Sequence, residues 1–419
     1  MRKRIAVIGG GASGLMAAIT AASEGAEPIL LEAADEVGKT IRATGNGRCN
    51  FSNADIMSSD YNQPEFVQRA FNMMTPEDVQ LAFSDMGLLA YEEDGGRIYP
   101  YSNKAATVVD VLCMTAAEEG VEMRCGVRVK SVAPSAGAGR MAAGAANAGW
   151  TVELENGDAE AFDAVIVSVG GAPSKGIVPT DIPFVRTHPV LAPIRTDTDA
   201  IAGLSGTRVR VRLYLDSDPE VLRDAWMDIQ DPADDVDYFG PEERGELLFR
   251  DYGISGIAAF DMSRHIRNGE MVFIDFLPDM DPQDKVDFIF GQAMDHPQRT
   301  AAQIVSGMLP ADVARAVIRA AGLNPDEPIL AEQEAVVIAM VSESFGLPTH
   351  GVEGKQAQVT RGGYAVSAFD PATMGCRAYP GLFVTGEALD VDGRCGGYNL
   401  HWAWTSGILA GRAAAEMLL

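Results

Sequence analysis

Residues 4–32 read RIAVIGGGASGLMAAITAASEGAEPILLE, and this stretch decides the fold. The apolar run Ile5–Ile8 is typical of a buried parallel strand, and Leu15–Ser23 carries alanine and leucine at helical density. Pro28–Leu31 reads as a second buried strand, which ends at Glu32. The stretch therefore predicts a β-α-β unit of about thirty residues.

Between the first strand and the helix, Gly9, Gly11 and Gly14 fit the pattern GxGxxG. The first glycine permits a tight turn, the second lets backbone approach a pyrophosphate, and the third lets the helix pack on the strand. Glu32 lies where an acid can accept hydrogen bonds from both ribose hydroxyls. Because an acid there disfavours a 2′-phosphate, we expect FAD or NAD rather than NADP. The alternative is a glycine turn beside a surface glutamate.

Composition narrows the class of protein. A chain of 419 residues predicts two or three domains. The formal net charge of −26 disfavours binding to nucleic acid. Five cysteines without a CxxC pair and five scattered histidines predict reduced thiols, a cytoplasmic location and no metal site. Glycines interrupt the N-terminal apolar run, and no stretch reaches about 18 uninterrupted apolar residues, so we expect neither a signal peptide nor a membrane span.

The rest of the chain alternates between strand and helix patterns. The expected long loop is 33–63, and the expected helical regions are 64–90, 104–119, 281–323 and the C-terminal segment. The expected strands are Val127–Val132, Trp150–Leu154, Ala164–Val169, Val209–Leu215, Glu246–Phe249, Met271–Phe276 and Leu382–Thr385. The strands after about residue 190 indicate a mixed sheet or a partial barrel. We therefore expect an α/β nucleotide-binding domain that is split in sequence by an insert.

The segment GLFVTGE, residues 381–387, separates FAD from NAD. It places Gly386 and Glu387 at the carboxyl end of a strand, where open α/β sheets bind their ligands. The acid can bond a ribityl hydroxyl, and the start of the following helix can face the carbonyl edge of a flavin. A simple NAD dehydrogenase has no reason to return its chain to this site, so we expect FAD.

Five motifs together resemble one family. GGGASGLMAA, TGNGRCNFSN, RDYGISG, TRGG and GLFVTGEALDVDGRCGGYNLHWAWTSG are similar to the HI0933-like (BaiN-like) family, a branch of the two-dinucleotide-binding flavoproteins. The resemblance implies noncovalent FAD and a split Rossmann-like domain in residues 1–190 and 355–419. It also implies an insert at 191–354, made of an incomplete β-barrel and a helical subdomain at about 281–330. Members of the family are assigned as NAD(P)H-linked oxidoreductases.

The resemblance also implies which residues hold the cofactor. The positions expected to bind FAD are Gly9, Gly11, Ala12, Ser13, Gly14, Glu32, Ala33, Lys39, Thr40, Gly45, Asn46, Gly47, Arg48, Cys49, Asn50, Val129, Gly170, Gly386, Glu387, Gly397, Tyr398 and Asn399. The glycine turn would take the pyrophosphate, Glu32 the adenosine ribose, and the backbone of Val129 the adenine. Glu387 would meet the ribityl chain.

The sequence departs from the family pattern at a few positions. Arg250 and Asp251 replace Thr-His of the insert motif, Ile257 replaces a proline, and His401 replaces a glutamine. These changes leave the FAD motifs intact and concern the substrate. His401 is either a catalytic acid or a residue of the first helical turn.

Two distant loops share the tripeptide Gly-Arg-Cys. Arg48 and Arg394 are expected near the phosphates or near the electron-rich edge of the flavin, where an arginine stabilises the reduced ring. Either Cys49 and Cys395 form a redox disulfide, or they are two small polarisable residues that pack under the flavin. The candidate catalytic residues are His401, Arg394 and Cys395.

The function expected is that of an FAD-dependent oxidoreductase acting on a small molecule, without a nucleic-acid or membrane partner; the oligomeric state stays open. Hydride would pass from NADH or NADPH through flavin N5 to a conjugated organic acceptor. No second GxGxxG is present, so the nicotinamide docks without a domain of its own or is not the donor. The alternatives are an FAD-dependent oxidase of a small amine, a flavoprotein with structural FAD and a macromolecular partner, and an RNA-modifying flavoenzyme, which the net charge disfavours.

Overall fold

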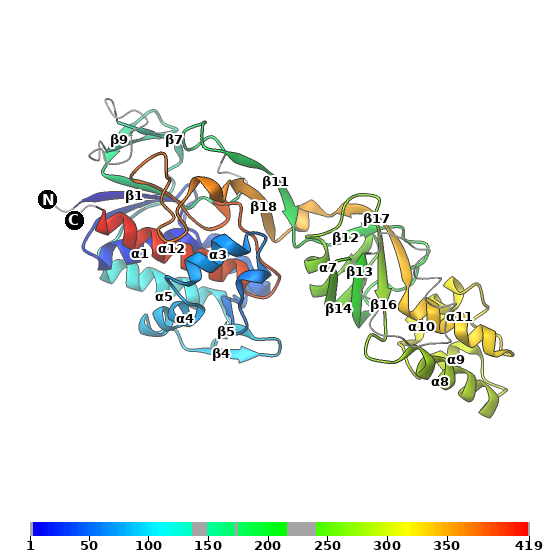
Figure 1. The fold of residues 1–419 in the computed structure, drawn as a ribbon. Helices are drawn as coiled ribbons and strands as arrows, with labels where there is room; N and C mark the ends of the chain where they lie inside the picture. The colour runs from blue at the N-terminus through cyan, green and yellow to red at the C-terminus, as the bar shows by residue number, and fades with distance from the viewer. Residues whose placement is uncertain (1–2, 136–148, 172–174, 216–239, 418–419) are drawn as a thin grey trace. The chain divides into compact units, whose positions relative to one another are not determined.

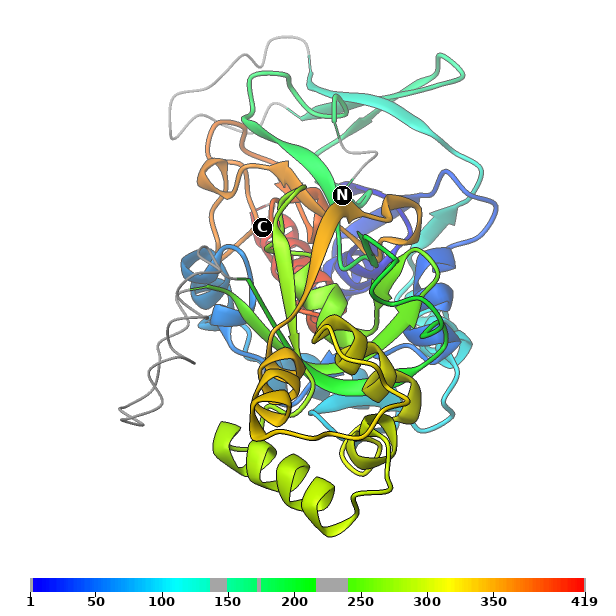
Figure 2. The ribbon, with the colours of Figure 1, turned by 90° about the vertical axis from the view of Figure 1, so that its right-hand side faces the viewer.

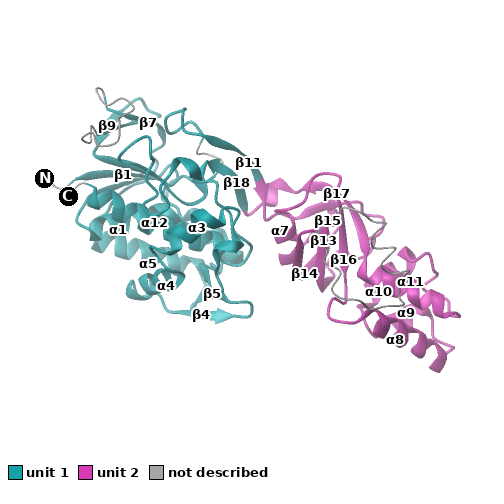
Figure 3. Cartoon of the chain, in the orientation of Figure 1, with its two compact units in different colours: residues 1–188, 359–419 teal, residues 189–358 magenta. Residues whose placement is uncertain are grey.

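The computed structural model describes residues 3–135, 149–171, 175–215 and 240–417. The chain forms two compact units: unit 1 contains residues 1–188 and 359–419, and unit 2 contains residues 189–358 (Figure 3).

A five-stranded parallel sheet forms the centre of unit 1. Its order is β19-β10-β1-β2-β6, with bounds β1 Arg4–Ile8, β2 Glu27–Leu31, β6 Glu122–Arg124, β10 Ala164–Val167 and β19 Leu382–Val384. Ile5 pairs with Pro28 on one side and with Ala164 on the other, so β1 lies in the middle. The last strand of the sheet comes from the C-terminal part of the chain. This confirms the predicted α/β class with a Rossmann-like sheet.

Helices cover one face of this sheet and a small antiparallel sheet covers the other (Figure 1). The covering helices are α1 Ala12–Ser23, α5 Ala105–Glu118 and α12 Tyr398–Glu416. Helices α1 and α12 approach closely because Gly407 and Gly411 lack side chains: a Cβ at either would lie 2.5 Å from the carbonyl oxygen of Ser13 or Ala17, respectively. The small sheet consists of β7 Val129–Pro134, β8 Trp150–Leu154 and β9 Ala159–Phe162.

Two expectations for unit 1 were wrong in detail. Region 64–90 is helical in α3 and α4, as expected, but a strand starts at Ala90. Pro76 starts a new helix at the N-cap Thr75, whose side chain accepts from the amide of Asp78. The expected loop 33–63 contains a short helix. The bounds are α2 Lys39–Ala43, α3 Pro64–Phe71, α4 Pro76–Asp85, β3 Ser52–Asn53, β4 Ala90–Glu93 and β5 Arg97–Pro100, and the three strands form a sheet of order β3-β5-β4.

Unit 2 is a barrel with helices beside it (Figure 2). The barrel is closed rather than incomplete, because β12 pairs with both β15 and β17. The strands are β12 Ile194–Thr196, β13 Arg208–Leu215, β14 Glu242–Arg250, β15 Gly253–Ser255, β16 Met271–Asp275 and β17 Phe345–Val352. The helices are α7 Ile257–Met262, α8 Pro282–Asp295, α9 Ala301–Val305, α10 Ala311–Ala320 and α11 Glu332–Glu343.

A separate pair, β11 Phe184–Val190 and β18 Val359–Tyr364, forms a two-stranded sheet.

Three charged side chains, Asp275, Lys285 and Glu343, are buried where the barrel meets its helices, and the half-buried Arg212 lies beside them. We call these four residues the barrel junction. Lys285 of α8 is 1 % exposed; it pairs with Glu343 of α11 and lies 4.0 Å from Asp275 of β16. Arg212 of β13 donates to the other oxygen of Asp275 at 2.9 Å. Two cations and two anions therefore join strands of the barrel to two helices.

The described residues contain neither a membrane-spanning helix nor a metal cluster. Among them, no helix is long and apolar enough to cross a membrane. Within the same residues, no group of three or more His, Cys, Asp or Glu side chains is placed to hold a metal ion.

Candidate functional site

Four strands of the parallel sheet end at the same edge, and each is followed by a motif identified in the sequence. β1 leads to Gly9, β2 to Glu32, β10 to Gly170 and β19 to Gly386. β1 is the switch point of the sheet, because the chain crosses from it to β2 on one side and β10 pairs with it on the other. Open α/β sheets bind their ligands at this edge, at the switch point.

The first glycine turn is too tight for side chains. Gly9 has a φ of 104°, and a Cβ there would lie 2.4 Å from the carbonyl oxygen of Ser168. A Cβ at Gly14 would lie 1.9 Å from the carbonyl oxygen of Gly9. These two glycines therefore bring the end of β1 and the start of α1 into close contact.

Gly11 differs from its neighbours because there is space beside it. A Cβ at Gly11 would meet nothing closer than the hydroxyl of Thr40, at 3.6 Å. Gly11 is the N-cap of α1, and no side chain caps this helix end. The amides of the first turn, at Ala12 and Ser13, lack intrahelical acceptors, so this end of the helix offers donors and a positive dipole to an anion.

Glu32 is fixed by both its backbone and its side chain. Its carboxylate accepts from the amide of Gly10 at 2.5 Å and from the amide of Ala34 at 2.7 Å. Its backbone amide donates to Arg124, and its carbonyl accepts from Val127. Each carboxylate oxygen has a second lone pair. The acid therefore supports the glycine turn and can still accept bonds from a ligand.

Glu387 is a half-buried acid at the end of β19. It accepts from the amide of Thr360 at 2.7 Å, and burial raises its pKa. Gly171 lies against the same pair, because a Cβ there would be 3.0 Å from the carboxylate of Glu387. Gly386 has a φ of 60°, and a Cβ there would be 2.8 Å from the hydroxyl of Ser13. This motif therefore adjoins the first turn of α1.

The structure brings the two Gly-Arg-Cys loops together. The side-chain amide of Asn53 donates to the carbonyl of Gly396 at 3.0 Å. A Cβ at Gly397 would lie 2.2 Å from the carbonyl oxygen of Ser52. The hydroxyl of Tyr61 donates to the carbonyl of Tyr398 at 2.9 Å. Segments separated by more than 300 positions thus share one surface at the start of α12.

Arg48 has several partners within the chain. Its guanidinium pairs with Glu93, donates to Asn103 at 2.9 Å and to the hydroxyl of Tyr91 at 2.9 Å, and lies 4.0 Å from the ring centre of Tyr99. Its charge is therefore matched by an acid of β4, which was not identified as its partner from the sequence. That Arg48 lies near the phosphates or the ring of a flavin stays a prediction.

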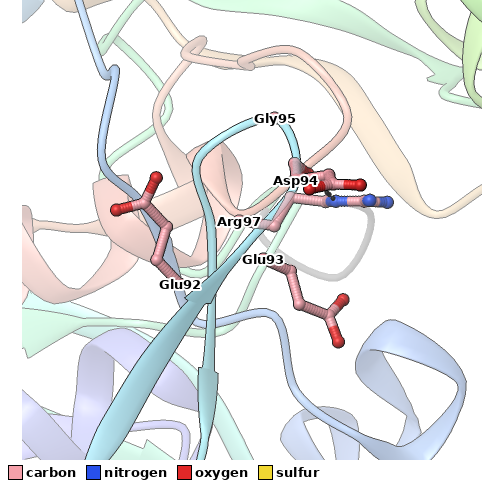
Figure 4. Close-up of a pocket in the computed structure, with 5 residues that line it drawn as sticks. All are labelled: Glu92, Glu93, Asp94, Gly95 and Arg97. Atoms are coloured by element: carbon pink, nitrogen blue, oxygen red, sulfur yellow. Dashed lines mark hydrogen bonds between the residues drawn. The ribbon is translucent and has the colours of Figure 1, made fainter.

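The hairpin β4–β5 also borders a surface hollow of about 680 Å³ (Figure 4). Its lining residues are Glu92, Glu93, Asp94, Gly95 and Arg97. Because Glu93 also pairs with Arg48, the hollow lies beside the first Gly-Arg-Cys loop.

Two acids that sequence reasoning missed organise the second loop. Asp392 is fully buried and accepts two bonds from the guanidinium of Arg361, at 2.6 Å and 2.7 Å. Asp390 accepts from the side chains of Asn62 and Gln63, at 3.1 Å each. The signal was present in the quoted motifs, since Arg361 belongs to TRGG and both acids belong to DVDGRC. The sequence alone did not show which partners these acids have.

The two cysteines of these loops both carry thiols. Cys49 is fully buried, and burial raises its pKa to about 11. Cys395 is half-buried. A disulfide between them is not formed, and a thiol with so high a pKa is not a nucleophile at neutral pH.

His401 is fully buried in the first turns of α12. Its Nδ1 lies 2.9 Å from the hydroxyl of Ser52, and its Nε2 has no hydrogen-bond partner among the described residues. The ring packs at a steep angle against Phe71, with ring centres 5.8 Å apart. Burial lowers the pKa of His401 to about 3, so the ring is neutral. The amide oxygen of Asn50 is a second buried atom for which the described part of the chain offers no hydrogen-bond partner.

The other positions predicted to bind the cofactor or to act in catalysis are exposed or half-buried. Those on the surface are Ala33, Lys39, Thr40, Gly45, Asn46 and Gly47, and those that are half-buried are Val129, Gly170, Arg394, Tyr398 and Asn399. Asn399 bonds the backbone of its own loop, with its amide donating to the carbonyls of Gly393 and Arg394.

Comparison with known proteins places the chain in a family. The family model described as "HI0933-like protein Rossmann domain" matches residues 3–413. The chain is 33% identical to a 3-dehydro-bile acid delta(4,6)-reductase of Clostridium scindens, over 99% of both chains. It is 26% identical to a ribosomal RNA dihydrouridine synthase of Escherichia coli, over 96% of this chain and 95% of the relative. A ribosomal RNA dihydrouridine synthase of Haemophilus influenzae is 25% identical over the same shares. The chain therefore belongs to the HI0933-like family, and it is an oxidoreductase of the flavoprotein class with a nucleotide-binding Rossmann fold.

Proposed function

We propose that the chain binds FAD noncovalently and passes hydride from NADH or NADPH, through the flavin, to a small organic acceptor whose double bond is conjugated. The observation that carries the proposal is the carboxyl edge of the parallel sheet. There the glycine turn, Glu32 and Glu387 follow strands that end side by side. The two Gly-Arg-Cys loops meet at the start of α12.

The residues at the first half of this edge fit the adenosine diphosphate part of FAD. The space beside Gly11 and the uncapped start of α1 suit a pyrophosphate. The amides of Ala12 and Ser13 would hold it. Glu32 has lone pairs left for the ribose hydroxyls, since each oxygen accepts one backbone amide.

The residues at the second half fit the ribityl chain and the ring. Glu387 is a half-buried acceptor suited to a ribityl hydroxyl. The amide oxygen of Asn50 is a buried acceptor without a partner, and no side chain caps the start of α12 at Gly397. An acceptor next to helix donors matches the pyrimidine edge of a flavin, where an N–H lies between two carbonyls. FAD, when bound, supplies the centre that accepts and returns hydride.

The acceptor class is proposed from the curated relative that is 33% identical, whose name describes a delta(4,6)-reductase of 3-dehydro bile acids. Reduction of a double bond conjugated with a carbonyl needs hydride at one carbon and a proton at the next. His401 is too deeply buried to exchange that proton with solvent. We therefore propose that the protein binds and orients the acceptor, and that the proton comes from a group that solvent can reach.

A second candidate is the reduction of uridine in RNA. It is favoured by the two relatives named ribosomal RNA dihydrouridine synthases. The net charge of −26 opposes it, because a strongly acidic protein repels the phosphate backbone. The lower identity of these relatives also places this candidate second.

Anaerobic reduction of the purified protein tests the proposal. We expect a yellow protein that releases FAD on denaturation, is bleached by NADH or NADPH, and is reoxidised by a conjugated steroid ketone but not by a uridine-containing rRNA fragment. Reoxidation by the RNA alone would favour the second candidate, and fast reoxidation by oxygen after reduction with an amine would indicate an oxidase. Isolation with NAD or without nucleotide, even after incubation with FAD, would refute the proposal.

Glu32→Ala tests the adenosine half. We expect FAD to bind about 1–3 kcal/mol more weakly, because charged hydrogen bonds are left unmade. Titration of FAD into the apoprotein measures the change. Glu36→Ala, which removes an exposed acid four residues further on, is the matched control and should leave the affinity unchanged.

A further inference from the structure

The segment 50–52 lies along the first turns of α12. Its contacts involve Gly397, His401 and Trp404, which recur about once per helical turn. Alternate residues of an extended segment are about 6.6 Å apart, and one turn of a helix rises about 5.4 Å. Asn50 and Ser52 can therefore face Gly397 and His401, respectively.

Three contacts hold this register. A Cβ at Gly397 would lie 3.0 Å from the amide oxygen of Asn50, so the two lie against one another. The hydroxyl of Ser52 bonds Nδ1 of His401 at 2.9 Å. The indole N–H of Trp404 donates to the carbonyl of Phe51 at 2.9 Å.

The surroundings of His401 exclude several roles. The ring is fully buried, its other nitrogen has no hydrogen-bond partner among the described residues, and it packs against the ring of Phe71. A group without access to solvent or to a second polar partner cannot relay a proton. Within the same residues the only polar contact of the ring is the bond to Ser52, so any polar contribution of the ring passes through that bond.

We propose that His401 is a positioning residue that, through Ser52, keeps the unpartnered amide oxygen of Asn50 beside the start of α12, where it accepts an N–H of the bound flavin. We call Asn50, Ser52 and His401 the loop junction. The inference rests on the proposed function, since the ligand served is FAD. It replaces the expectation that His401 is a catalytic acid.

The experiment compares His401→Leu, His401→Gln and Ser52→Ala in the full chain, reconstituted with FAD. Leucine cannot bond Ser52, so we expect roughly tenfold weaker binding of FAD, about the value of one hydrogen bond. We also expect a changed visible spectrum and a changed reduction potential of the flavin. Glutamine can bond Ser52 and should restore all three readouts. Ser52→Ala should resemble His401→Leu, and the double variant should be no worse than the worse single variant.

Ile408→Ala is the matched control, because Ile408 is buried in the same helix but does not belong to the loop junction. It should lower the melting temperature without changing the flavin spectrum. If His401→Leu does not fold, Ser52→Ala alone tests the bond.

Three results would overturn the inference. The first is unchanged affinity, spectrum and potential in Ser52→Ala. The second is a His401→Leu variant with an unaltered flavin that no longer reduces the acceptor, which would make His401 an acid. The third is a wild-type protein that binds no FAD, which would refute the proposed function as well.

Discussion

The two units bury polar side chains in opposite ways. The barrel junction of unit 2 holds two cations and two anions, of which Asp275, Lys285 and Glu343 are buried, and each lies beside an opposite charge. The loop junction of unit 1 buries neutral groups, and two of their atoms, Nε2 of His401 and the amide oxygen of Asn50, have no hydrogen-bond partner among the described residues. The first arrangement matches its charges within the chain, whereas the second leaves two neutral polar atoms without a bond in the part of the chain that the structure describes.

The difference separates structure from ligand binding. A buried charge that loses its partner is strongly destabilising, so a paired network fixes the elements that carry it. A buried acceptor without a partner costs about 1–3 kcal/mol, and a ligand that supplies a donor removes this cost. We therefore expect changes at the barrel junction to alter stability and changes at the loop junction to alter FAD binding.

The largest effect is expected for Lys285→Met. This change leaves Glu343 and Asp275 buried with one cation fewer, and we expect unit 2 to lose about 3–5 kcal/mol of stability. Hydrogen exchange in peptides from β16 and α8 measures the loss. Lys355→Met, which removes an exposed lysine of the same unit, should change nothing.

A second change separates lost pairing from lost packing. Adding Glu343→Leu to Lys285→Met removes the orphaned acid, and most of the stability should return because hydrophobic replacement of a buried pair is often neutral. A double variant no more stable than Lys285→Met would show that the ion pair is not what holds the junction.

Asn50→Leu should have the opposite signature. The apoprotein should be as stable as the wild type or more stable, because an unpartnered buried oxygen is removed. Affinity for FAD should fall about fivefold to tenfold, the value of one hydrogen bond. Calorimetric titration and thermal denaturation of the apoprotein measure the two quantities. A loss of stability without a loss of affinity would contradict the distinction between the junctions. Asn72→Leu, at an exposed asparagine, is the control.

A smaller effect is expected at Glu387, a half-buried acid of unit 1. Burial raises its pKa in the folded state, so the native protein holds this proton more tightly than the unfolded chain does. Its contribution to the free energy of unfolding is therefore fully present below the ordinary glutamate pKa and is lost as the pH rises through the raised value. Glu387→Gln should remove this pH-dependent loss of stability. Denaturation of both apoproteins between about pH 4 and about pH 8 measures it, and parallel curves would contradict it.

Much of the fold could be predicted because its signals are local. The apolar run of β1, the glycines of the first turn and the acid at the end of β2 lie within about thirty residues, the usual length of a β-α-β unit. The hairpin β4–β5 was missed although Asp94-Gly95-Gly96 is a hairpin turn signal. Closure of the barrel was missed because it depends on pairing between β12 and β17, which are far apart in the chain.

The sequence predicted which segments form the site, but it did not predict which side chains contact one another there. The two Gly-Arg-Cys loops were identified, yet the partner of Arg48 lies on the missed hairpin. The bond between Ser52 and His401 joins residues 349 positions apart. The pairing of Arg361 with Asp392 was hidden in the same way. Such pairings leave no local pattern in the sequence, because the fold brings together residues that are hundreds of positions apart in the chain.

The smallest effects are expected at the cysteines of the two loops. Cys49 belongs to the same buried surface as the loop junction, but burial raises its pKa to about 11, so it stays a thiol. Cys49→Ser and Cys395→Ser should therefore retain most of the rate of flavin reduction by the nicotinamide donor, measured by stopped-flow bleaching. Arg48→Ala should be slower than either, because it removes the partner of Glu93 and loosens the loop that carries Asn50. If a cysteine variant keeps its FAD and loses turnover with an oxidised acceptor, the shared Gly-Arg-Cys is a redox pair, and unit 1 buries reactive rather than inert groups.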